Sequence, residues 1–303
     1  MDALFAALPW LTNPTVIIRQ VMAGLANGML LFLVASGLSL IFGLSRVINF
    51  GHGALFMIGA YLAYSVVGTN SPDLVTFIAM LFAATIGLFV VGVAFEMAIL
   101  RRIYNSPQAF QLLVTFGLVL IAGDAVRLIW GPAEKSVPLP PIIDDVIQLF
   151  GVTFPLYRAL LIAIGAAVCL ALWWLLYRTH WGVLVRAATA DREMLRALGV
   201  NVRRIYTVIF GVGAALAGLA GALMAPIVSI GPGLHADVLT EAFVVVAIGG
   251  LGSFPGALVG ALLVGQANAF GILSFPQMSI VVPFVLMAVV LILRPRGLMG
   301  HIE

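Results

Sequence analysis

Apolar runs long enough to cross a lipid bilayer recur along the whole chain, and short stretches that hold its charges and prolines separate them. A helix needs about 20 apolar residues to cross a hydrocarbon layer of roughly 30 Å. Since 63% of the 303 residues are hydrophobic and only 9% are charged, there are too few polar side chains to cover a water-soluble surface. The pattern predicts an all-α, polytopic membrane helix bundle of about eight or nine spans, at 16–44, 53–67, 74–98, 110–130, 156–177, 206–229, 238–251, 256–271 and 279–293.

Two of these runs, 53–67 and 238–251, are short and border glycine-rich turns. Non-helical backbone at membrane depth is tolerated only where protein or water covers it. Both runs are therefore predicted to be broken or short helices that line a central path. The similar strings HGAL (52–55) and PGAL (255–258) favour two pseudo-two-fold halves within a single transmembrane domain over 1–303.

The placement of cations predicts the orientation of the spans, because Lys and Arg accumulate in short cytoplasmic loops. Alternating the spans puts 11 of the 15 basic residues on the side of the loop 178–205. This loop is thus predicted to be cytoplasmic and the proline-rich loop 131–155 extracytoplasmic and extended. The N-terminus is expected outside and the C-terminus in the cytoplasm.

The cytoplasmic loop has no proline between His180 and Arg204, and its apolar residues recur near one helical face. An amphipathic helix pair lying at the membrane surface is predicted. Glu193 precedes Gly199 by six residues, a spacing that suits a short helix opened by an acid and ended by a glycine. The result is either a knob that transmits force from a soluble partner or a solvated interfacial helix.

The sequence contains none of the common signatures of catalysis or of metal and nucleotide binding. It lacks the phosphate-binding G-x-x-x-x-G-K-[ST] motif, the nucleophile-elbow G-x-S-x-G motif and paired cysteines. We expect no catalytic residue, cofactor, metal site or nucleic-acid partner. Asp124 with Arg127, and Glu96 with the arginines that follow it, are predicted to be local ion pairs.

Small polar groups within or between the apolar runs are candidates for the translocation path or its gate. The turn 45–53 is the most specific of these, since it combines a cation, an amide, glycines and an imidazole. For the turn 45–53 the alternative is an ordinary interfacial loop. For the other polar groups the alternative is a role in helix packing or in backbone hydrogen bonding. The candidates are Asn27, Ser39, Asn49, Gly51, His52, Gln111, Thr115 and Asn268.

Four strings carry a resemblance to a known family: GLSLIFGL (37–44), RVINFGHG (46–53), AIGGLGS (247–253) and PGA (255–257). They closely resemble the permeases of high-affinity branched-chain amino acid importers of the ABC class, and the similarity covers essentially the whole chain. The resemblance implies a permease subunit that moves branched-chain amino acids across the bacterial inner (plasma) membrane. It also implies a second, homologous permease subunit, two cytoplasmic ABC ATPases and an extracytoplasmic solute-binding protein as partners, with membrane lipid around the spans.

In such importers ATP is hydrolysed on the partners, so the chain itself is not expected to be an enzyme. The resemblance places the coupling to the ATPases in the cytoplasmic loop, on Arg186, Asp191, Arg192, Glu193, Arg196 and Gly199. The wider E-A-A-x-x-x-G pattern is only partly kept, since Met194 and Leu195 replace the two alanines. Two alternatives stay open: a permease for urea, amides or another small solute, and a stand-alone channel or secondary transporter.

Overall fold

The computed structural model describes residues 13–149, 151–274, 276–278 and 280–300. The protein is almost entirely helical in these ranges, which confirms the predicted all-α membrane bundle. The helices are α2 (Pro14–Ser45), α3 (Gly51–Val67), α4 (Leu74–Phe95), α5 (Arg101–Ile103), α6 (Gln108–Trp130), α7 (Leu156–Arg178), α8 (His180–Ala190), α9 (Arg192–Ala197), α10 (Val202–Met224), α11 (Leu234–Gly249), α12 (Phe254–Ser274) and α13 (Val282–Leu293). A hairpin of β1 (Val146–Leu149) and β2 (Val152–Pro155) completes the fold.

Helix boundaries follow local capping chemistry. The side chain of Asn13 accepts a hydrogen bond from the Thr15 amide at 3.1 Å, and proline occupies the first position of α2. Asp73 caps α4 in the same way through the amide of Thr76 at 3.0 Å. These caps satisfy amide groups that the first helical turn leaves without a partner.

Six helices within the described ranges are long and apolar enough to cross a membrane: α2, the continuous segment Leu74–Ile103, α6, α7, α10 and α12. The shorter helices α3, α11 and α13 account for the remaining predicted runs. The two runs predicted to be short, 53–67 and 238–251, are indeed the short helices α3 and α11. The chain is therefore a multi-pass membrane protein.

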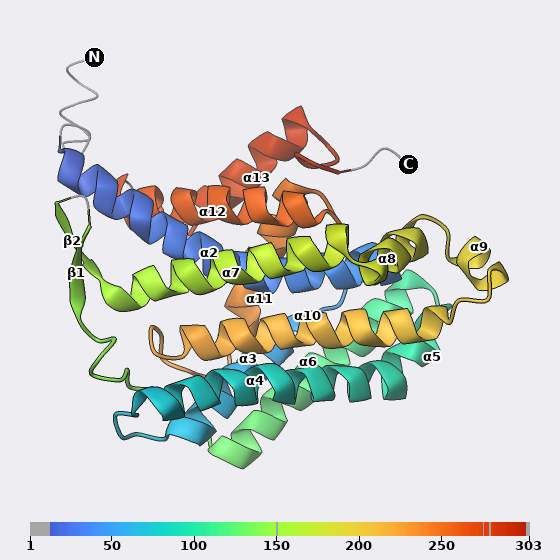
Figure 1. Cartoon of the computed structure of the whole chain (residues 1–303), viewed down its shortest axis with the longest axis horizontal. Coiled ribbons are helices and arrows are strands. Elements are labelled where there is room, and N and C mark those ends of the chain that lie inside the picture. The colour runs from blue at the N-terminus through green and yellow to red at the C-terminus, as the bar shows by residue number, and fades with distance from the viewer. Residues whose placement is uncertain (1–12, 150, 275, 279, 301–303) are drawn as a thin grey trace.

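The core of the bundle is the crossing of α2 and α10, which run through the centre of Figure 1 and are the most buried of the long helices. A Cβ on Gly37 would lie 2.7 Å from the carbonyl oxygen of Gly213, and one on Gly213 would lie 2.9 Å from that of Gly37. The two helices can approach this closely only because neither residue carries a side chain. By contrast, fewer than a quarter of the residues in the most apolar stretches of α4, α6 and α7 are buried.

Packing around this crossing has a pseudo-two-fold pattern. Helix α4 packs along α10 as α12 packs along α2, and α3 contacts α4 and α6 as α11 contacts α12 and α13. The first half is thus α2, α3, α4 and α6, and the second is α10 to α13. The predicted halves are present, but the strings HGAL and PGAL do not mark equivalent positions, since they open α3 and α12.

Three local features differ from the sequence-based expectation. The span that begins at Leu74 continues through a π-helical turn, Glu96–Leu100, to Ile103. The end of the predicted outer loop forms a hairpin, with Val146 paired to Pro155 and Leu149 to Val152. Helix α10 begins at Val202, earlier than predicted, because the side chain of Asn201 caps it through the amide of Arg204. We call the end of the bundle that carries β1 and β2 the hairpin end and the opposite end the knob end (Figure 1).

Candidate functional site

A pocket of about 360 Å³ opens at the hairpin end between α2, α11, α12 and the start of α7. We call it the hairpin-end pocket. Apolar side chains form most of its wall, and four polar side chains also line it. The lining residues are Asn27, Leu30, Leu31, Val34, Phe56, Arg158, Met224, Ile227, Val228, Val238, Glu241, Asn268, Ile272 and Ile280.

Two of the predicted path residues, Asn27 and Asn268, meet in this pocket although they lie at opposite ends of the sequence. The amide of Asn268 donates to Oε1 of Glu241 at 3.5 Å. Glu241 and Arg158 were not among the predicted site residues. Glu241 is the only acid in the apolar run 238–251, which is a signal that the sequence does contain.

The turn between α2 and α3 is enclosed by protein. Arg46 ends α2 with a left-handed backbone (φ 56°), and its amide donates to the Phe42 carbonyl at 2.8 Å. The Asn49 side chain accepts a hydrogen bond from the amide of Gly51, the first residue of α3, at 3.0 Å. Nε2 of His52 lies 3.0 Å from the Val34 carbonyl oxygen. Asn49 and His52 are fully buried, so they hold this turn against the central crossing.

The other three predicted path residues have different surroundings. The Gln111 amide donates to the carbonyl oxygens of residues 103, 104 and 106, which joins the start of α6 to the end of α5. The Thr115 hydroxyl donates to the carbonyl of Gln111 within the same helix at 3.0 Å. Ser39 is buried on α2, beside a pocket of about 640 Å³ that opens at the knob end. The eight candidates therefore do not form one continuous surface.

The predicted helix pair of the inner loop is present as α8 and α9. The carboxylate of Asp191 accepts from the amides of Glu193 and Met194, both at 2.9 Å, and so caps α9. Gly199 follows the helix with φ +82°, a conformation that favours glycine. Leu195 faces inward, whereas the side chains of Met194 and Leu198 are 60% and 72% exposed. We call the segment 191–199 the knob.

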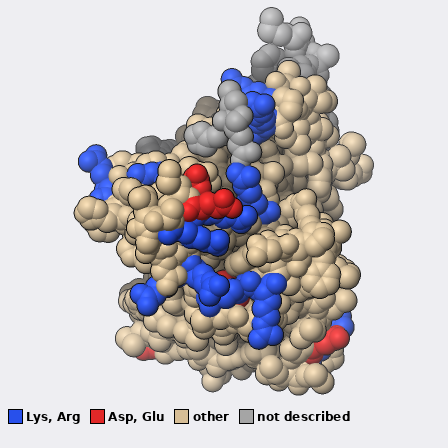
Figure 2. All heavy atoms as spheres, turned by 90° about the vertical axis from the view of Figure 1, so that its right-hand side faces the viewer, with Lys and Arg blue, Asp and Glu red and all other residues tan. Residues whose placement is uncertain are grey.

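Arginines surround the knob. Figure 2 views this end of the molecule and shows Lys and Arg side chains gathered across it, with a smaller group of acids among them. A pocket of about 650 Å³ beside the knob is lined by Arg101, Arg192, Arg196 and Arg203. Arg186 points back toward the bundle, since its guanidinium donates to the Leu176 carbonyl. The predicted coupling residues thus lie together at one end of the protein.

A buried carboxylate connects this face to the bundle. Glu96 accepts hydrogen bonds from Arg101 at 3.0 Å and from the Thr207 hydroxyl of α10 at 2.8 Å, which confirms the predicted local ion pair. The Tyr104 hydroxyl also donates to it at 3.3 Å. Burial, and then the charge of Glu96, raise the pKa of Tyr104. The pair of Asp124 and Arg127, at 3.2 Å, is confirmed as well.

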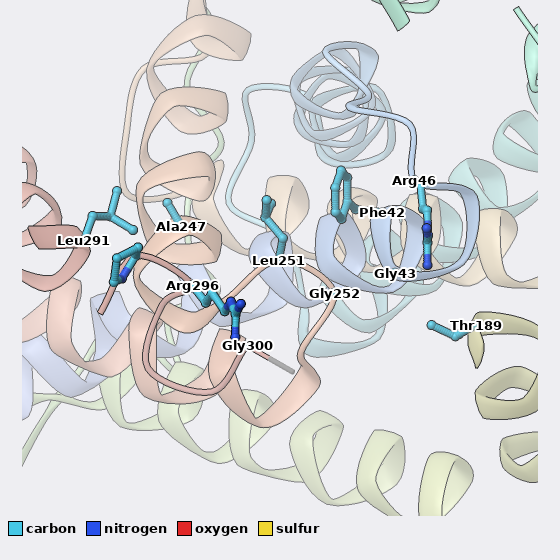
Figure 3. A pocket seen from close by; sticks show the side chains of 11 residues that line it. Phe42, Gly43, Arg46, Thr189, Ala247, Leu251, Gly252, Leu291, Arg296 and Gly300 are labelled. Atoms are coloured by element: carbon cyan, nitrogen blue, oxygen red, sulfur yellow. The ribbon is translucent and has the colours of Figure 1, made fainter. Parts of the chain in front are cut away.

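A larger pocket of about 820 Å³ opens at the knob end between α2 and the ends of α11 and α13. Figure 3 shows it with Arg46 on one side and Arg296 on the other. Thr189 at the end of α8 also lines it. The chain after α13 closes one wall, because the amides of Leu298 and Met299 donate to the carbonyls of residues 248 and 249.

No group of three or more His, Cys, Asp or Glu side chains within the described ranges is placed to hold a metal ion. The only cysteine, Cys169, is half-buried on α7 and is not in a disulfide. The described surfaces offer polar groups around a pocket at the hairpin end and a charged knob at the other end.

Membrane-spanning helices around a central crossing, with short glycine-bordered helices inside and a helical knob at one end, make this a polytopic membrane protein. The family model described as "Branched-chain amino acid transport system / permease component" matches residues 20–291. The chain belongs to this family.

Curated relatives cover nearly the whole chain. It is 31% identical over 297 residues to the high-affinity branched-chain amino acid transport system permease protein BraD of Pseudomonas aeruginosa, across 94% of this chain and 96% of that one. It is 29% identical to LivH of Escherichia coli, described in the same words, with the same two coverages. The ribose import permease protein RbsC of Escherichia coli is 28% identical over 89% of this chain and 81% of its own.

Among solved structures, PsaBC from Streptococcus pneumoniae in complex with Fab matches with a TM-score of 0.50. The two chains are 13% identical, and the match covers 98% of this chain and 97% of the other. This similarity concerns the fold alone.

Proposed function

We propose that the chain is the membrane-spanning permease subunit of an ABC importer that moves branched-chain amino acids across the bacterial inner membrane. The proposed partners are a second, homologous permease subunit, two cytoplasmic ATPases and an extracytoplasmic solute-binding protein. The whole chain forms one transmembrane domain, with loop 178–205 in the cytoplasm and loop 131–155 outside. The N-terminus is then outside and the C-terminus in the cytoplasm.

The observation that carries this proposal is the knob on a chain that belongs to a family of transport permeases. The side chains of Met194 and Leu198 on the knob are exposed, and Arg192 and Arg196 of the same segment line the pocket beside it. Exposed apolar side chains rimmed by charge are typical of a protein–protein contact. In the proposed orientation this contact is cytoplasmic, where an ATPase would bind.

The knob has a direct mechanical link to the centre of the bundle. It leads through Val200 into α10, which crosses α2 at Gly213. The first turns of α10 are also joined to α4 by the bond between Thr207 and Glu96. Force on the knob would therefore tilt α10 against both halves of the bundle. Differential binding of the partners to two states supplies the energy for alternating access.

Branched-chain amino acids are the proposed substrates because the relatives BraD and LivH carry that description. The mainly aliphatic wall of the hairpin-end pocket fits such side chains. A permease for urea, an amide or another small solute is the alternative, and the similarity to RbsC shows that related chains serve other solutes. A stand-alone channel or secondary transporter is the alternative from another class.

The proposal is tested by changing the exposed surface of the knob. Leu198→Asp should abolish co-purification of the ATPase subunits with the permease and stop ATP-dependent leucine uptake. The matched control is Ile142→Asp, since Ile142 is similarly exposed, at 65%, but lies in the opposite loop. ATPase subunits that bind the Leu198→Asp permease as well as the wild type would refute the proposed docking surface.

A further inference from the structure

We propose that Glu241 and Arg158 bind the two charges of a zwitterionic amino acid as it passes through the hairpin-end pocket. The Glu241 carboxylate would accept hydrogen bonds from the α-ammonium group, and the Arg158 guanidinium would donate to the α-carboxylate. The inference rests on the proposed function, which it extends by naming the groups that contact the substrate.

The first support is that both charges line the same pocket without pairing with each other. Within the described ranges Glu241 has one hydrogen-bond partner, the Asn268 amide at 3.5 Å, and Arg158 has no hydrogen bond or ion pair. Both residues are only partly exposed. An acid and a base that face one small space without neutralising each other are complementary to a ligand that carries both charges.

The second support is energetic. A charged side chain in the hydrocarbon region of a membrane is costly, and such residues usually face a pathway or a partner. Glu241 lies in α11, one of the two short helices inside the bundle, and receives only one long hydrogen bond. Protein contacts therefore offset little of this cost. A passing ammonium group offsets it during transport.

The third support is the rest of the pocket wall. Leu30, Leu31 and Val34 of α2, with Phe56 and Val238, present aliphatic and aromatic surface beside the charges. A volume of about 360 Å³ is at the small end of the usual range for small-molecule sites. An aliphatic side chain fits against this wall while the backbone groups of the amino acid face Glu241 and Arg158. Asn27 and Asn268 add amide groups to the same wall.

The test uses the complete importer with its binding protein, reconstituted in vesicles. Glu241→Gln and Arg158→Gln each remove one charge and keep the size of the side chain. Each should lower leucine uptake about tenfold or more, because a hydrogen bond to a charged group is lost. The controls are Asp124→Asn and Arg127→Gln, which form an exposed pair on α6 outside the pocket and should leave uptake unchanged.

A charge swap separates substrate contact from a structural role. Glu241→Arg and Arg158→Glu should each abolish uptake, and the double variant should restore part of it by binding the zwitterion in reverse. All variants are compared for assembly with the partner subunits.

If the wild-type complex imports leucine and both glutamine variants import it equally well, the roles inferred for Glu241 and Arg158 are overturned but the proposed function is not. Loss with Arg158→Gln but not with Glu241→Gln would indicate contact with a lipid phosphate and would also overturn it. A wild-type complex that imports no leucine would overturn the proposed function as well.

Discussion

Replacing Gly37 with alanine should force apart the crossing of α2 and α10. The new Cβ would lie 2.7 Å from the Gly213 carbonyl oxygen and 3.1 Å from Cε1 of His52, where ordinary contacts begin at 3.4 Å. The nearest atom belongs to helical backbone, which cannot rotate away as a side chain can. The two central helices must therefore separate by several tenths of an ångström.

The expected cost follows from this geometry. Overpacking a dense interior by one methyl group typically costs about 1–3 kcal/mol. For a chain of this size each kcal/mol lowers the midpoint of thermal unfolding by about 2 °C. The purified protein in detergent should thus unfold several degrees earlier than the wild type, as measured by the fluorescence of its five tryptophans.

The matched control is Gly117→Ala in α6, where an added Cβ would meet no atom within 4 Å. Alanine favours a helix over glycine by up to about 1 kcal/mol, so this variant should be unchanged or slightly more stable. A Gly37→Ala protein as stable as Gly117→Ala would refute the reasoning, because the crossing would then have room for a side chain.

Two further predictions concern the knob end. Asp191→Ala should weaken α9 by about 1 kcal/mol, since two amides lose their acceptor, and should speed hydrogen exchange over 192–197. The matched variant Asp191→Asn keeps an oxygen that can accept these hydrogen bonds. Exchange as fast in Asp191→Asn as in Asp191→Ala would contradict the capping role. Glu96→Ala should lower stability by about 1–3 kcal/mol, because Thr207 loses a buried partner and Arg101, 35% exposed, must turn to water. Asp124→Ala, from an exposed pair, should change stability by less than about 0.5 kcal/mol, and equal losses in the two variants would argue against the network.

The spans and the class of fold could be predicted from the sequence because the requirement for apolar length acts locally. Even the short helices α3 and α11 were visible as short runs beside glycine-rich turns. The ion pairs at Glu96 and Asp124 could be predicted for the same reason, since their partners lie within two helical turns.

Features that depend on distant contacts could not be predicted in the same way. The π-helical turn at Glu96–Leu100 has no signal in the apolar pattern. The hairpin depends on pairing across a turn at Gly151, which composition does not specify. The string HGAL suggested an equivalence with PGAL, but the packing of α4 on α10 and of α12 on α2 assigns the halves differently.

The candidate site also combines features that the local sequence indicates with features that arise only when distant segments pack together. Asn27 and Asn268 were identified as polar residues in apolar runs, yet their meeting in one pocket is a property of the packed bundle. Arg158 and Glu241 line the same pocket only because the packed bundle brings the start of α7 and α11 around one space. Gln111 and Thr115 were candidates because they are polar, but their hydrogen bonds go to nearby backbone carbonyls.

The proposed function requires that this chain move branched-chain amino acids only as part of an ATP-driven assembly. Its most direct test is uptake of radiolabelled leucine into vesicles that hold the purified chain alone, or the chain with its permease partner, ATPases and binding protein. We expect no uptake by the chain alone and ATP-dependent uptake by the full set. Leucine uptake by the chain alone, without ATP or partners, would contradict it and favour a stand-alone channel or secondary transporter.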